Sequence, residues 1–210
     1  MYKAARMMFS GGLAGKALGF VRDLRWKYHL APASNSASHN EGLNMFMQGK
    51  IGMYITGPWD VQTLKKKPEL KWEVAPLPVK QRAATLLGTE NYAISAASKH
   101  PQEAWELYKF LLSARSQEFM AAQLEKMPSR RSVAEGPYLR QPAHYSRKVF
   151  VDALSYALPA PNIPEWDEVS HPLQEQMDLI WVGKKTAEQG LRDATKGMNE
   201  SLAKIRAGKG

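Results

Sequence analysis

The stretch KIGMYITGPWDV, residues 50–61, decides the class of fold, because an apolar run leads directly into the start of a helix. Residues 50–56 have the composition of a buried strand. Gly57 and Pro58 begin the helix, since proline is preorganised for the first helical position. Strands that lead directly into helices are typical of α/β proteins. The sequence therefore predicts an α/β fold in which Trp59 lies where the strand ends.

Helical patterns dominate the rest of the chain. Helix signals occur in residues 13–28, 40–49, 58–67, 98–111, 114–124, 143–157, 166–180 and 186–205. Asn40 and Gly49 are the expected caps of the second of these helices, and Thr186 with Gln189 forms a capping box for the last. The inner face of the helix at 98–111 is expected to consist of Ala104, Leu107, Tyr108 and Leu111. Residues 72–77 should form an extended strand that Pro76 confines to a sheet edge or a strand end. Residues 86–95 should form a glycine turn that feeds a strand.

Composition limits the partners of the chain. Its 210 residues, 44% of them hydrophobic, suffice for one large domain or two small ones. No apolar run approaches the roughly 20 residues of a membrane helix. Lys16 and nearby glycines interrupt the apolar region at the N-terminus, so we expect no signal peptide in this chain. The net charge of +9 is spread along the sequence and predicts no nucleic-acid partner.

The sequence has no local signature of an enzyme or a cofactor. It contains no cysteine, and its five histidines are far apart, which argues against a metal site. Neither a nucleophile-elbow motif nor a phosphate-binding loop occurs. The carboxylates of Glu118, Glu125, Asp167 and Glu168 are expected on helix surfaces, in contact with solvent. We therefore expect neither catalysis nor a cofactor.

Trp59 is the first candidate for a binding residue. In open α/β sheets, ligands bind beyond the carboxyl ends of strands, where helix N-termini offer free amides. A sugar ring has apolar C–H faces that can lie on an indole, while its hydroxyl groups need polar partners and exposed backbone, as at Gly57. Packing of Trp59 in the core of the strand–helix junction explains the same pattern equally well.

Further candidates also have two explanations each. The second candidate segment comprises Gly88, Thr89, Glu90 and Asn91. It offers accessible backbone, donors and acceptors, and an ordinary turn explains the same residues nearly as well. Arg130 could reach a cleft from its loop, or it is simply an exposed arginine. Trp166 follows Pro164, but its place on an apolar helical stripe favours packing in the core.

The order of several short motifs resembles a known family. The motifs are MFMQGKIGM (45–53), GPW (57–59), VAPLP (74–78), NYAIS (91–95), SKHPQEAW (98–105), LLS (111–113), MPSR (127–130) and PNIP (161–164). With the first and last helices, their order and spacing resemble the C-terminal half of an extracellular solute-binding protein of the maltose-binding-like family, also called family 1. These proteins are the sugar-capturing components of bacterial ABC importers.

The resemblance implies a periplasmic-binding-protein-like fold of type II, of which this chain is a helix-rich fragment. Residues 1–83 would belong to the C-terminal lobe, 84–136 would cross into the N-terminal lobe, and 137–210 would return. Family members are longer, so the preceding half would be absent through truncation or a split gene. The family commonly stacks its ligand at the Gly-Pro-Trp position, which here holds Trp59. It often has paired glycines where this chain has Gly88 and Thr89, a departure that affects the local geometry.

The function implied by the resemblance is capture of a carbohydrate between two lobes and its delivery to a membrane permease. The implied location is periplasmic or extracellular, with a lipoprotein anchor as an option for the full-length form. Exposed apolar helix faces would favour association with the missing N-terminal half or self-association. Three alternatives stay open: a binding protein for an anionic ligand such as a glycerol phosphodiester, a carbohydrate-active enzyme, and a truncated fragment that binds no ligand.

Overall fold

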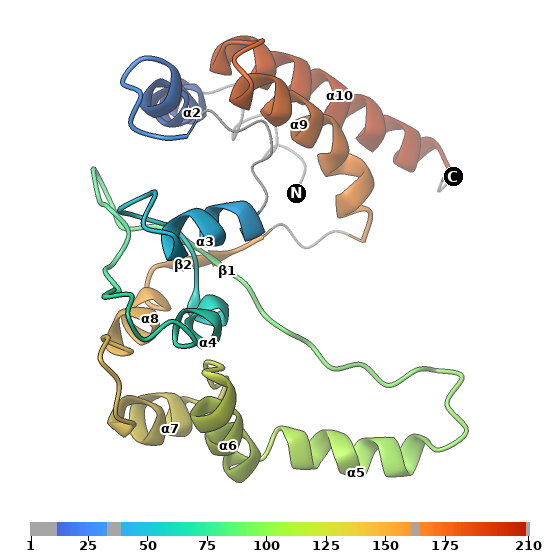
Figure 1. The fold of residues 1–210 in the computed structure, drawn as a ribbon. Coiled ribbons are helices and arrows are strands. Elements are labelled where there is room, and N and C mark those ends of the chain that lie inside the picture. Colours follow the sequence, from blue (N-terminus) through green and yellow to red (C-terminus); the bar gives the residue numbers. More distant parts are fainter. Residues whose placement is uncertain (1–11, 33–38, 161–163, 209–210) are drawn as a thin grey trace. The chain divides into compact units, whose positions relative to one another are not determined.

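The computed structural model describes residues 12–32, 39–160 and 164–208. The chain forms two compact units. The terminal unit consists of residues 1–38 and 161–210, and the central unit consists of residues 39–160 (Figure 1). These units divide the chain at other positions than the predicted lobe segments do, and the assignment of segments to lobes stays a prediction.

The described part of the terminal unit is built from three helices, all of them predicted. They are α2 (Gly12–Trp26), α9 (Trp166–Trp181) and α10 (Ala187–Ala207). Figure 1 shows α9 and α10 side by side, and their contact buries Val169, Met198 and Leu202. Gly190 permits this close packing, because a Cβ atom there would lie 2.5 Å from Cδ1 of Ile180. The contact between α9 and α10 therefore holds the main apolar cluster of this unit.

Hydrogen bonds fix the ends of these helices in two places. The predicted capping box is confirmed: the backbone N–H of Gln189 donates to the hydroxyl of Thr186 over 3.1 Å, and the Gln189 side chain accepts from the Thr186 backbone N–H. The side chains of Arg25 and Trp26 both donate to the carbonyl of Trp181, over 3.0 and 3.1 Å. The C-terminal end of α2 is thereby tied to the C-terminal end of α9.

The central unit consists mostly of short helices. They are α3 (His39–Met47), η1 (Pro58–Asp60), α4 (Val61–Leu64), α5 (Pro101–Leu111), α6 (Ala114–Leu124), α7 (Arg131–Val133), the π-helical turn η2 (Ala134–Tyr138) and α8 (Lys148–Ala153). The left-handed cap at Gly49 is confirmed by its φ of 69°. Asn40 is not the N-cap, because α3 already includes His39.

Two predicted helices are shorter than expected. The helix expected at 58–67 ends at Leu64. The helix expected at 143–157 is reduced to α8, because Tyr145 and Arg147 in the preceding segment turn toward a buried carboxylate and hold the chain in a loop.

The sheet is smaller than predicted. Strands β1 (Thr85–Leu87) and β2 (Ala157–Pro159) pair in parallel, with Thr85 opposite Ala157. The predictions of strands at 50–56, 72–77 and after Gly88 are wrong. A strand needs a neighbour for its hydrogen bonds, and the described residues supply a ladder only between β1 and β2. The 50–56 segment is also not buried, since Met53 is 90% exposed and Ile55 is 75% exposed.

The apolar face of α5 is not buried. No residue of this helix is buried, and Leu107 and Phe110 are 57% and 61% exposed. The expectation that Leu107 faces inward is therefore wrong for the chain as it stands. Figure 1 shows α5 joined to its unit at the α6 end, with no other labelled element along its length. The helix is amphipathic, and its apolar face is covered only in part: the rings of Tyr92 and Tyr108 lie 6.2 Å apart, whereas Leu107 and Phe110 stay exposed.

Neither a membrane-spanning helix nor a metal site is found among the residues that the structure describes. Within residues 12–32, 39–160 and 164–208, no helix is both long and apolar enough to cross a membrane. The same residues contain no group of histidine, aspartate and glutamate side chains placed to hold a metal ion.

Candidate functional site

Trp59 lies on a short helical segment directly after Gly57. It belongs to the 3₁₀ turn η1, which continues without interruption into α4. The indole is 65% exposed. A Cβ atom on Gly57 would lie only 2.3 Å from Cζ3 of this ring, so the ring packs directly over the glycine backbone. Gly57 and Trp59 thus form an exposed aromatic surface supported by the chain itself, which we call the Trp59 platform.

Residues on both sides of the Trp59 platform anchor it to the central unit. Asp60 is 4% exposed, and its carboxylate accepts a hydrogen bond from the hydroxyl of Thr56. Val61 and Leu64 are 2% and 4% exposed and hold α4 against the unit. Buried residues follow Trp59 in the same helical segment. The direction of the indole therefore depends on how that segment packs against the rest of the central unit.

The segment from Gly88 to Asn91 follows β1 and is exposed. Nothing lies within 4 Å of a Cβ atom placed on Gly88, so the packing does not require glycine there. The carboxylate of Glu90 accepts a hydrogen bond from the ammonium group of Lys126. Thr89 and Asn91 are exposed beside it. The segment therefore exposes polar groups to solvent, and its charged residue, Glu90, is already paired with Lys126.

Arg130 is held at the end of α5. Its Nε donates to the carbonyl of Leu112 over 2.5 Å. Its backbone N–H donates over 2.9 Å to the side chain of Gln117, whose amide also donates to the hydroxyl of Ser129. The guanidinium group remains exposed. The loop that carries Arg130 is thus fixed to the two helices before it.

The structure brings the predicted site residues together only in part. Gly57 and Trp59 touch, and Glu90 pairs with Lys126 in the loop that leads to Arg130. Trp166 belongs to the terminal unit, where its half-buried ring packs against the Val169 cluster, in the core position that its stripe predicts.

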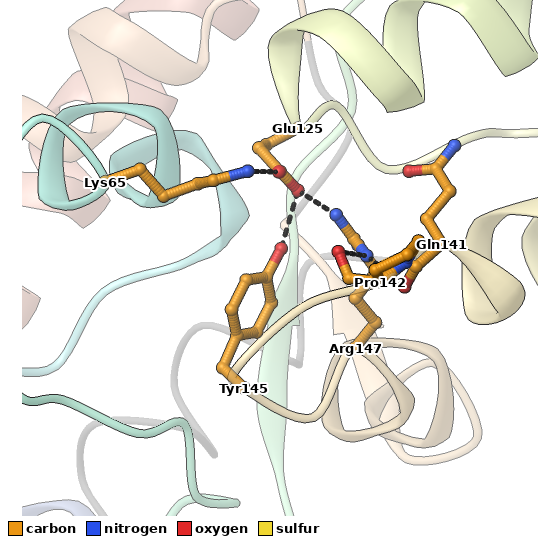
Figure 2. Close-up of polar contacts among 6 residues, drawn as sticks. All are labelled: Lys65, Glu125, Gln141, Pro142, Tyr145 and Arg147. Carbon is orange, nitrogen blue, oxygen red and sulfur yellow. Dashed lines mark hydrogen bonds and ion pairs between the residues drawn. The ribbon is translucent and has the colours of Figure 1, made fainter. Parts of the chain in front are cut away.

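One buried carboxylate was missed by sequence reasoning. Glu125 was expected in solvent, but it is 3% exposed. Its Oε1 accepts from Nζ of Lys65 over 2.5 Å, and its Oε2 accepts from the hydroxyl of Tyr145 over 2.6 Å and from Nη2 of Arg147 over 2.7 Å (Figure 2). Arg147 is itself 5% exposed and also donates to the carbonyl of Gln141 over 2.7 Å. We call these residues the Glu125 cluster.

The backbone explains why Glu125 points inward. It follows the last residue of α6 in the left-handed conformation, with φ of 54°. This conformation costs a residue other than glycine about 1–3 kcal/mol, so contacts with the surrounding residues must stabilise it. If α6 continued by one more residue, Glu125 would lie on its solvent side. The left-handed backbone at Glu125 turns the side chain into the protein instead. The sequence signal for this was a glutamate at the position where helices often end in glycine.

The charged groups of the Glu125 cluster stabilise one another in their ionised forms. Burial raises the pKa of the Glu125 carboxyl, but the hydrogen bonds from Lys65, Tyr145 and Arg147 outweigh burial and bring the pKa below its ordinary value of 4.5. Burial and the hydrogen bond to this carboxylate raise the pKa of Tyr145, and burial raises the pKa of Tyr138 to about 12. The Arg147 guanidinium lies 5.4 and 5.3 Å from the ring centres of Tyr138 and Tyr145. The cluster is therefore an ionised carboxylate bound by two cations and one neutral phenol.

Comparison with known proteins identifies sequence relatives. Residues 7–146 match the family described as bacterial extracellular solute-binding protein. The galactooligosaccharide-binding protein of Bacillus subtilis is 24% identical over 176 residues, which are 80% of this chain and 41% of that protein.

Several solved protein structures have a fold similar to that of this chain. The maltose-maltodextrin binding protein of Alicyclobacillus acidocaldarius is 30% identical and superposes with a TM-score of 0.78, over 89% of this chain and 50% of that one. A cyclo/maltodextrin-binding protein complexed with maltotetraose is 28% identical with a TM-score of 0.72, over 90% of this chain and 48% of that one. The chain therefore has the fold of part of a maltose-binding-like protein and spans about half the length of these relatives.

Proposed function

The chain belongs to the bacterial extracellular solute-binding proteins, and we propose that it is the carbohydrate-binding part of such a protein in an ABC importer. The proposed function is capture without catalysis: a sugar binds between two lobes that close by a hinge and then passes to a membrane permease. The proposed location is periplasmic or extracellular. The names of the relatives, which specify galactooligosaccharide, maltose and maltodextrin, support carbohydrate as the ligand class.

The observation that carries this proposal is the Trp59 platform. An indole that is 65% exposed and packs over the Gly57 backbone offers a flat apolar face to a ligand. The C–H faces of a sugar ring are complementary to such a surface. We propose that Gly57, Trp59, residues 88–91 and Arg130 contact the ligand. Trp166 is the least supported member of the predicted site, because its ring packs against the core of its own unit.

Two alternatives are less well supported by the contacts. An anionic ligand is favoured by the net charge of +9, but that charge is spread along the sequence, and one of the five N–H donors of Arg130, at Nε, is already bonded to the Leu112 carbonyl. A carbohydrate-active enzyme would need an available acid or base, whereas Glu90 is paired with Lys126. Product formation from an oligosaccharide, lost in the Glu90→Gln variant, would establish the enzyme.

Calorimetric titration of the chain with maltotetraose and with glycerophosphodiesters tests the proposal. We expect saturable binding of the neutral oligosaccharide, with a Kd that is nearly the same at low and high salt, because no charge is neutralised. Binding of the phosphodiester alone, weakening steeply with salt, would instead identify an anion-binding protein. A folded chain that binds neither ligand would contradict the proposal for this chain.

We also propose that the exposed apolar face of α5 packs against the part of the fold that this chain does not span. The chain covers 50% of the maltose-maltodextrin binding protein of Alicyclobacillus acidocaldarius. No residue of α5 is buried. Without that part, the isolated chain should self-associate through Leu107 and Phe110. Sedimentation velocity should show oligomers that dissociate when both residues are replaced by glutamate. A well-folded monomer of the unaltered chain would contradict this expectation.

A further inference from the structure

The two oxygens of the Glu125 carboxylate hold different segments of the central unit. Oε1 binds Lys65, the residue directly after α4. Oε2 binds Tyr145 and Arg147, in the loop before α8. Figure 2 shows these partners approaching the carboxylate from separate elements. Each connection can therefore be removed without the other.

The Oε1 connection leads to the Trp59 platform. Trp59 lies in η1, which is continuous with α4, and Lys65 follows the last residue of α4. The pair between Lys65 and Glu125 thus ties the far end of this helical segment to the end of α6. Lys65 keeps 44% of its side chain exposed, and half-exposed ion pairs contribute little to overall stability. This pair is better suited to setting the position of a segment than to holding the unit together.

The same carboxylate also fixes the start of the loop that carries Arg130. Glu125 is the first residue after α6, and its left-handed backbone begins the loop at 125–130. At the other end of this loop, Gln117 binds Ser129 and the Arg130 backbone over 2.9 Å each. Through Glu125, two segments proposed to contact the ligand have a common attachment point.

We propose that Glu125 is a positioning residue, which sets the orientation of the Trp59 indole through Lys65. This inference rests on the proposed function insofar as the indole is a sugar-binding surface. The carboxylate itself does not contact the ligand. It acts by holding Lys65, at the end of the segment from Pro58 to Lys65, against the first residue after α6.

Two variants separate positioning from stability. Lys65→Met keeps the aliphatic side chain and removes the Oε1 partner, whereas Tyr145→Phe removes one Oε2 partner and keeps the ring that stacks on Trp72 with centroids 5.1 Å apart. Both lose one hydrogen bond to Glu125, but only Lys65 is attached to the Trp59 segment. Lys65→Arg restores a cation and is the conservative variant.

The first measurement uses the chain without sugar. After incorporation of 5-fluorotryptophan, the ¹⁹F resonance of Trp59 is assigned by its loss in Trp59→Phe. We expect Lys65→Met to shift or broaden this resonance, Lys65→Arg to restore it, and Tyr145→Phe to leave it unchanged. An unchanged resonance in Lys65→Met, or equal changes in Lys65→Met and Tyr145→Phe, would overturn the proposal.

The second measurement is calorimetric titration with maltotetraose. We expect Lys65→Met to raise Kd up to about fivefold, the limit for an ion pair worth about 1 kcal/mol, while Tyr145→Phe leaves it within about twofold. A variant Lys65→Met that binds as tightly as the parent chain would overturn the positioning role. A chain that shows the expected resonance changes but binds no sugar in any form contradicts the proposed function and still supports the role of Glu125 in orienting Trp59.

Discussion

Trp59→Ala is expected to weaken carbohydrate binding about 30-fold or more while leaving the fold intact. Removal of an aromatic anchor from a binding site costs about 2 kcal/mol or more, which corresponds to a roughly 30-fold increase in Kd. Because the indole is 65% exposed, its loss removes little buried surface, and the free energy of unfolding should change by less than about 1 kcal/mol. Calorimetric titration with maltotetraose and urea unfolding measure the two quantities separately.

The matched control for this variant is Trp105→Ala. Trp105 is a tryptophan of the same central unit and is 46% exposed on α5. It is not among the residues proposed to contact the ligand, so its replacement should leave Kd unchanged. Gly57→Ala provides a second variant that keeps Trp59, since the added methyl group would overlap the ring at 2.3 Å and force it to move. We expect Kd to rise in Gly57→Ala as well. Equal Kd values for Trp59→Ala and Trp105→Ala would remove Trp59 from the site.

Glu125→Ala is expected to lower the free energy of unfolding by about 3–5 kcal/mol, because removal of one partner leaves a buried charge unpaired. The Arg147 side chain is 4% exposed and cannot turn to solvent without moving its loop. The left-handed backbone at residue 125 would also lose the contacts that hold it. Urea unfolding followed by circular dichroism measures the loss.

The control for this second variant is Glu118→Ala on the same helix. Glu118 is exposed on α6, and its replacement should change stability by no more than about 0.5 kcal/mol. Glu125→Gln keeps the size of the side chain and one acceptor oxygen, so its effect should lie between the other two. If Glu125→Ala and Glu118→Ala destabilise the chain equally, the Glu125 cluster does not have the energetic role assigned to it.

The Glu125 cluster also predicts a dependence of stability on pH. Since the folded state lowers the pKa of Glu125, the carboxylate stabilises the fold fully above its ordinary value of 4.5, and this contribution is lost as the pH falls through the lower folded-state value. The difference in unfolding free energy between the parent chain and Glu125→Gln should therefore be constant near neutral pH and shrink below about pH 4.5. A difference that grows on acidification would contradict the assignment.

Local sequence signals predicted the helices well. The spacing of apolar residues placed α6 at its observed limits, and Thr186 with Gln189 marked the start of α10. Gly49 marked the C-terminal end of α3. These features depend on residues a few positions apart, which contact one another within a single helix. The order of the motifs also identified the family correctly.

The strands could not be predicted in the same way. An apolar run such as residues 50–56 becomes a strand only if another strand lies beside it, and among the described residues only Thr85–Leu87 and Ala157–Pro159 find each other. The partners are about seventy residues apart in the chain. Composition therefore indicated extended segments but did not decide which of them would pair.

The sequence by itself determined the positions of most of the longer helices, the caps at Gly49 and Thr186, the family and the place of Trp59 at the start of a helical segment. Only the tertiary structure decided that its indole is exposed over Gly57 and that Glu125 is buried with Lys65, Tyr145 and Arg147. The reason is physical: a helix is specified by neighbours along the chain, whereas a buried charge is tolerated only where distant segments bring its partners to it.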